Sequence, residues 1–251
     1  VPGYTGYQYI GSTNGLAGTS YLDDNGGADL SRGIEYCYMV VACFPDGAVG
    51  YASEEFCAYL NRDLPLITNV SVRNTDIVDG SIFVAWSKPT ELDTVQIRGP
   101  YEYRVLRSDI TDPANFQLQE TYFNLNDTTF VDTLMNTEEL EFYYKIELFN
   151  DEPGDEFVVG ESDSASSVFI QAIGTDNQIQ LIWNEMVPWI NDTFDIYRET
   201  TTGVFALIDS TTEQMYVDTG LANGVEQCYR IESRGHYSIG GVVDPILNWS
   251  Q

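Results

Sequence analysis

The chain has 251 residues, of which 43% are hydrophobic, so it is long enough for two or three small domains with buried cores. Its 39 acidic and 11 basic side chains give a formal net charge of −28. Such a surface repels phosphate backbones and anionic membranes, which excludes nucleic acid as an expected partner. No apolar run is long enough to cross a bilayer, so we expect no membrane span.

A short motif occurs three times along the chain. It reads Tyr21-Leu22-Asp23-Asp24, Phe130-Val131-Asp132-Thr133 and Tyr216-Val217-Asp218-Thr219. A strand-like run precedes each copy, at residues 7–12, 116–121 and 205–210. An alternating strand follows each copy, at residues 35–40, 141–146 and 226–231. Self-similarity at this spacing indicates a tandem array.

Two alternating runs end in tryptophan, at Trp86 and Trp183. A proline-containing loop follows each, and then another strand, at residues 101–106 and 194–198. Short strands at regular spacing, divided by turn residues, are typical of an immunoglobulin-like sandwich. We therefore predict an all-β fold of tandem immunoglobulin-like β-sandwiches, with almost no helix.

The repeats predict the domain organisation. Residues 61–163 and 164–251 each match one module, whereas residues 1–60 match only the C-terminal half of one. That half lacks a tryptophan-bearing strand, so its inner face needs partner strands from elsewhere. The chain begins at Val1 in mid-module, and we expect it to be a fragment of a longer protein.

At this point the chain resembles fibronectin type III modules, through Trp86 and Trp183 on the second strand and an aromatic on the sixth (Tyr38, Tyr144 and Tyr229). Five runs are similar to the modules of gliding motility-associated surface proteins exported by the bacterial type IX secretion system: 36–47, 51–57, 86–93, 176–178 and 220–229. In that family the modules precede a C-terminal sorting domain. The resemblance implies a secreted or outer cell-surface protein whose partners are other modules and outer-membrane secretion or anchoring proteins.

The spacing of two cysteines predicts a disulfide. Cys37 and Cys57 flank a hairpin that turns at residues 45–47, and if Phe44 faces Gly50, the two cysteines face each other. Directly opposed residues of an antiparallel pair lie within disulfide range. The alternative is two free buried thiols. Cys228 has no evident partner.

Little in the chain points to catalysis. The single histidine, His236, lies in a turn without a nucleophile motif, so we predict no enzyme and no cofactor. One loop offers oxygen ligands that suit calcium, although it lacks the spacing of an EF-hand. Its residues are Asp23, Asp24, Asn25 and Asp29, and the alternative is a solvated turn.

Strand phase predicts an apolar face. If Tyr36, Tyr38, Val40 and Ala42 point inward, then Met39, Val41 and Cys43 point outward. An exposed apolar face often marks a contact, so a partner or a neighbouring module is one interpretation, and ordinary exposed apolar residues are the other.

A last set of sites follows from the resemblance. Asp-Ser/Thr followed by a small or aliphatic residue is similar to the O-glycosylation motif of the bacterial group that carries such modules. The candidate acceptors are Thr94, Thr128, Thr133, Ser164 and Ser210.

Two functions fit these observations. The first is a non-catalytic stalk of a large secreted or surface protein, such as an adhesin. The second is a set of accessory modules, with carbohydrate binding as one role, in a secreted hydrolase whose catalytic domain lies outside this chain.

Overall fold

The computed structural model describes residues 6–15, 17–27, 30–60 and 62–251. The chain divides into a compact unit that ends at Ser31 and a second that begins at Arg32. Each unit is described by itself.

The first unit contains one short 3-10 turn, η1 (Asn25–Gly27), and its described residues form no strand. The strand-like run at 7–12 is therefore a wrong prediction. Tyr9 is 78% exposed and Leu22 is 82% exposed, and the Tyr21 hydroxyl donates to the Ile10 carbonyl at 2.7 Å. Strand propensity alone cannot hold an extended segment, because its backbone groups need a ladder of partners.

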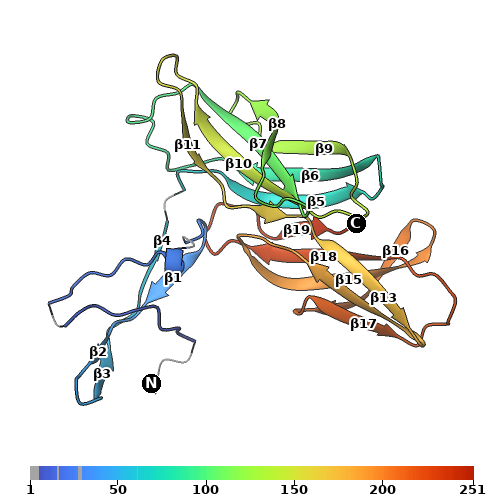
Figure 1. Ribbon diagram of the computed structural model, residues 1–251, viewed down its shortest axis with the longest axis horizontal. Coiled ribbons are helices and arrows are strands. Elements are labelled where there is room, and N and C mark those ends of the chain that lie inside the picture. The colour runs from blue at the N-terminus through green and yellow to red at the C-terminus, as the bar shows by residue number, and fades with distance from the viewer. Residues whose placement is uncertain (1–5, 16, 28–29, 61) are drawn as a thin grey trace. The chain divides into compact units, whose positions relative to one another are not determined.

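The middle sandwich consists of two antiparallel sheets (Figure 1). The three-stranded sheet has the order β5 (Leu66–Asn74), β6 (Gly80–Ser87), β9 (Thr129–Met135). The facing sheet has the order β11 (Phe157–Glu161), β10 (Phe142–Asn150), β7 (Tyr101–Asp109), β8 (Gln117–Tyr122). A short strand, β12 (Ala165–Ser166), also pairs with β10, although it follows the boundary expected at 163/164.

The last sandwich repeats this three-plus-four arrangement. One sheet has the order β13 (Phe169–Thr175), β14 (Gln178–Asn184), β17 (Met215–Thr219). The other has the order β16 (Val204–Thr211), β15 (Ile190–Thr201), β18 (Tyr229–His236), β19 (Ile246–Trp249). The predicted all-β fold of tandem immunoglobulin-like sandwiches is confirmed.

Alternation along the central strands builds both cores. Val84 and Trp86 occupy alternate positions of β6, and Leu181 and Trp183 do the same on β14, and all four are buried. The Trp86 ring meets an aromatic ring of the facing sheet, that of Tyr103, edge to face at 5.5 Å between centroids. Trp183 makes the equivalent contact with a ring 5.3 Å away. Edge-to-face pairs of this kind add to the free energy gained from burial.

Two short hairpins precede the sandwiches in the second unit. The strands β1 (Glu35–Tyr38) and β4 (Phe56–Tyr59) form one two-stranded sheet, and β2 (Val41–Cys43) and β3 (Val49–Ala52) form another. Neither of them pairs with a further strand in the described residues.

Candidate functional site

The predicted cysteine pair is a disulfide in the structure. Cys37 and Cys57 are directly opposed on β1 and β4, with a Cα–Cα distance of 4.0 Å and an S–S distance of 2.01 Å. The register expected at the turn is wrong, because the Phe44 amide donates to the Ala48 carbonyl rather than facing Gly50. The register shifts by one residue between Cys43 and Val41 and by one more between Val41 and Tyr38, so that the cysteines pair as expected.

The same disulfide occupies the one cluster of possible metal ligands in the described part of the chain. Glu35, Cys37 and Cys57 bring ligand atoms within 4.8 Å of one another. The two sulfur atoms are bonded to each other, so they do not offer thiolates to a metal.

The candidate calcium ligands accept hydrogen bonds from backbone amides of their own loop. An Asp23 carboxylate oxygen accepts the Asn25 amide at 3.0 Å, and one of Asp24 accepts the Gly26 amide at 3.1 Å. Asp29 lies outside the described residues. Calcium binding by this loop stays a prediction.

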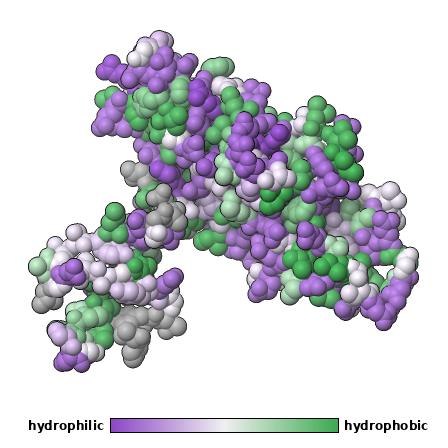
Figure 2. Space-filling view, viewed as in Figure 1, coloured by the Kyte–Doolittle hydropathy of each residue, from purple (hydrophilic) through white to green (hydrophobic). Residues whose placement is uncertain are grey.

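Along β1 and β2, the residues expected to point inward are not consistently more buried than those expected to point outward. Met39 and Val41 are half-buried and Cys43 is exposed, whereas Val40, expected to point inward, is 74% exposed. Strand phase alone therefore does not decide which side is buried. Figure 2 shows hydrophobic residues over the β2–β3 hairpin. Whether this surface binds a partner stays a prediction.

The glycosylation candidates differ in accessibility. Thr94, Thr133 and Ser210 are exposed, whereas Thr128 and Ser164 are half-buried. The Ser210 hydroxyl already donates to an Asp195 carboxylate oxygen at 2.6 Å. Thr94 and Thr133 are therefore the most accessible acceptors of the five.

His236 belongs to a surface pair. It is the last residue of β18 and does not lie in the expected turn, and its half-buried ring has Nδ1 2.8 Å from a carboxylate oxygen of the exposed Asp192. An imidazole–carboxylate pair needs a positioned nucleophile for acyl transfer. The contacts that the structure describes for this ring include no hydroxyl or thiol.

The aspartate of the repeated motif has a role that sequence reasoning did not identify. In the middle sandwich the buried Asp132 accepts hydrogen bonds from the Tyr144 hydroxyl at 2.9 Å and from Arg107 Nη1 at 2.8 Å. Burial, followed by the nearby Asp132 charge, raises the pKa of Tyr144 well above its usual value. The phenol therefore stays a hydrogen-bond donor.

The last sandwich repeats this cluster. Asp218 accepts from the Tyr229 hydroxyl at 2.8 Å and from Arg198 Nη1 at 2.6 Å. The signal was present in the sequence, because the motif aspartate, the sixth-strand tyrosine and an arginine on an earlier strand (β7 or β15) all recur. The motif thus marks a structural cluster in each sandwich and not a site for ligands.

The two sandwiches of the second unit are joined by a set of hydrogen bonds. Strand β19 lies against β5, and three successive hydrogen bonds link the two strands. Asn69 Nδ2 donates to the Leu247 carbonyl, the Val70 amide to Asn248 Oδ1, and the Trp249 amide to Ser71 Oγ, each at 2.9 Å. Each bond joins residues 178 apart, so the two strands run parallel here.

Apolar burial continues across this junction. Trp189, Tyr237 and Ile246 of the last sandwich belong to the core cluster of the middle one. The buried Tyr237 hydroxyl also donates to the Ile67 carbonyl at 2.8 Å. A shared core combined with directional bonds fixes the relative orientation of two modules far better than a flexible linker does.

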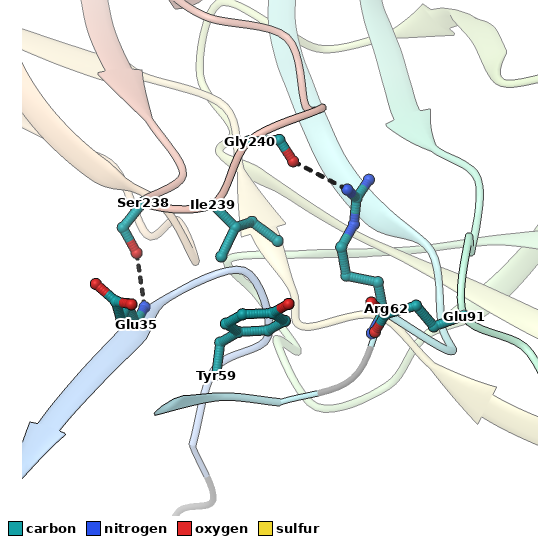
Figure 3. Close-up of a pocket in the computed structure, with 7 residues that line it drawn as sticks. All are labelled: Glu35, Tyr59, Arg62, Glu91, Ser238, Ile239 and Gly240. Atoms are coloured by element: carbon teal, nitrogen blue, oxygen red, sulfur yellow. Dashed lines mark hydrogen bonds between the residues drawn. The ribbon is translucent and has the colours of Figure 1, made fainter. Parts of the chain in front are cut away.

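A polar cavity of about 430 Å³ lies beside the junction (Figure 3). Its lining includes Arg62, whose buried guanidinium donates to the Gly240 carbonyl at 3.1 Å and to Ser87 Oγ at 3.2 Å. The Arg62 amide donates to the Glu91 carboxylate at 2.7 Å. The Arg62 guanidinium thus links Ser87 of the middle sandwich to Gly240 of the last one beside this cavity.

This fold defines the class of protein, a tandem of immunoglobulin-like β-sandwiches. Among solved structures, the chain is similar to the chicken CNTN1 FN1–FN3 domains, with 13% identity over 89% of this chain and 78% of that one, and a TM-score of 0.23. That likeness carries no inference about function. No family model and no curated protein matches the sequence. In the described residues no helix is long and apolar enough to cross a bilayer.

Proposed function

We propose that this chain forms non-catalytic stalk and interaction modules of a large secreted or cell-surface bacterial protein, an adhesin that the type IX secretion system exports. The observation that carries the stalk role is the junction, where β19 and β5 are joined by three successive bonds and a shared core. A stalk transmits position only if consecutive modules hold a fixed angle.

Different observations support export by this secretion system. The runs at 36–47 and 220–229 are similar to the modules of proteins exported in this way. A disulfide between Cys37 and Cys57 suits an oxidising compartment outside the cytoplasm. The net charge of −28 keeps such a chain soluble.

Spin-label distances test the stalk role. Labels at Thr94→Cys and Thr202→Cys, in a background with Cys43 and Cys228 replaced by serine, report on the two sandwiches. We expect a narrow distance distribution that broadens when Asn248→Ala removes the acceptor of the Val70 amide. A broad distribution in the parent protein contradicts a rigid spacer.

Localisation tests the export route separately. Surface proteolysis of intact cells should degrade the protein in a strain with the secretion system and spare it in a strain without it. Equal degradation in both strains rules out this route. Specific binding of the isolated chain on a glycan array would instead favour the accessory role in a secreted hydrolase.

A further inference from the structure

A buried carboxylate without a counter-cation lies at the junction. Glu185, in the loop between β14 and β15, is partly exposed as a residue, but its carboxylate is buried and receives hydrogen bonds from three side chains. One oxygen accepts from Asn191 Nδ2 at 2.7 Å. The other accepts from the Ser233 hydroxyl at 2.7 Å and from Asn248 Nδ2 at 3.5 Å.

Two of these side chains, Asn191 and Asn248, can present only their amide N–H groups to Glu185. Asn191 Oδ1 accepts the Trp189 indole N–H at 3.1 Å, which directs its amide N–H groups at Glu185. Asn248 Oδ1 accepts the Val70 amide of the middle sandwich, which does the same. Donors aimed at the site disfavour a cation and favour an ionised carboxylate. Only the Ser233 hydroxyl can switch to accepting the proton of a neutral one.

Burial opposes that ionised form. Desolvation raises the pKa of Glu185 to about 7, against the hydrogen bonds from Ser233, Asn191 and Asn248, which lower it. The charge of Glu141, a buried residue just before β10 in the middle sandwich, raises it further. Burial also raises the pKa of Glu141. Each sandwich thus contributes one buried acid to the junction.

One serine joins the Glu185 loop to the middle sandwich. Ser166 lies on β12, which pairs with β10, and its hydroxyl donates to the Ser167 carbonyl at 3.1 Å and accepts the amide of Met186, the neighbour of Glu185, at 2.8 Å. The Ser166 amide donates to the Met186 carbonyl at 2.7 Å. A change of charge on Glu185 therefore acts on atoms of both sandwiches.

The other ionisable groups on the surrounding strands are engaged elsewhere. On β15 and β18, Asp192 binds His236, and Arg234 binds Asp195 and Glu232. On β10, Lys145 binds Glu161. The strand β19 carries no charged residue, and Arg73 of β5 lies over the Phe83 ring. None of these cations offsets the charge of Glu185.

We propose that Glu185 is a pH-sensitive latch between the two sandwiches, tightened when mildly acidic solution protonates it and loosened when mildly alkaline solution ionises it. The direction follows from linkage. A group whose pKa is higher in the closed state than in the open one binds its proton more tightly when closed, so rising pH favours opening. If opening restores the usual value of 4.5, the opening constant rises about tenfold from pH 6 to pH 8.

Tryptophan NMR gives a direct readout. The Trp189 indole N–H is bonded to Asn191, which contacts Glu185, and the chain has only four tryptophans to assign. Between pH 5 and pH 9 we expect this resonance to move with a midpoint near 7. Hydrogen exchange of the Val70 amide, corrected for its intrinsic pH dependence, should accelerate about tenfold between pH 6 and pH 8.

Three variants separate Glu185 from its neighbours. E185Q should abolish both transitions, and E141Q should lower the midpoint because it removes the repelling charge. H236Q, in the surface pair with Asp192, should leave the midpoint unchanged. The proposal is overturned by a wild-type midpoint below pH 5, by a transition that persists in E185Q, or by one that disappears in H236Q. If E185Q does not fold, the midpoints measured for the wild type, E141Q and H236Q test the proposal.

Discussion

At the residue scale, the buried Asp–Tyr–Arg cluster explains why one motif recurs. A buried carboxylate is tolerable only when its lone pairs are satisfied, and Asp132 and Asp218 each receive a phenol and a guanidinium. The aspartate thereby ties three strands of each sandwich together. The flanking aromatic and valine of the motif lie on strands β9 and β17.

This cluster gives the first prediction. Asp132→Asn removes the charge that Arg107 binds and leaves a neutral amide oxygen, a weaker acceptor, for the two donors that share Oδ2. We expect the free energy of unfolding to fall by about 1–3 kcal/mol in a denaturant titration. Asp127→Asn, an exposed acid in the preceding loop, is the matched control and should change it by about 0.5 kcal/mol or less. Equal effects of the two variants would contradict a structural role for the cluster.

At the element scale, the same strand position has different surroundings in different repeats. Alignment on Tyr38, Tyr144 and Tyr229 makes Val40 equivalent to Ile146 and Ile231. The two isoleucines are 0% exposed and Val40 is 74% exposed. Val40 lies between β1 and β2, whereas the two isoleucines lie on central strands of complete sandwiches, so the sequence position alone does not decide its burial.

A comparison across the repeats follows. Ile146→Ala and Ile231→Ala should each cost about 2–4 kcal/mol of unfolding free energy, because each leaves a cavity in a packed core. Val40→Ala should cost about 0.5 kcal/mol or less. Chemical denaturation of the three variants checks this. A large cost at Val40 would mean that a partner or another segment covers this row in solution.

The disulfide acts on the hairpin alone. It closes a loop of 20 residues between β1 and β4, for which chain entropy suggests about 3 kcal/mol of stabilisation. Reduction should therefore speed hydrogen exchange in residues 35–59 and leave that of residues 66–249 unchanged. The exposed, free Cys43 offers a control, since Cys43→Ser should change neither region. Loss of protection throughout the sandwiches on reduction would contradict this division.

At the scale of the whole molecule, the two sandwiches should unfold together. Their junction shares core residues and buries the Asn248 side chain, which is 0% exposed. Asn248→Ala leaves the buried Val70 amide without its acceptor, a change expected to cost about 1–3 kcal/mol. We expect one calorimetric transition to become two in this variant.

An exposed amide in the same sandwich provides the control. Gln171→Ala should preserve the single transition, because Gln171 lies on the exposed side of β13. Two transitions in the unmodified protein would show that the junction is too weak to couple the sandwiches, and the stalk proposal would lose its main support.

The sequence by itself determined the strands of the two sandwiches, the tandem repeat and the inward tryptophans. These follow from alternation and turn spacing, which act between residues near one another in the chain. The tertiary structure decided the rest, because Val70 and Asn248 meet across 178 residues and no local pattern records such a contact. It also decided that the run at 7–12 is not a strand and that the Glu185 carboxylate is buried. Both depend on contacts with segments distant in the sequence, which local periodicity does not encode.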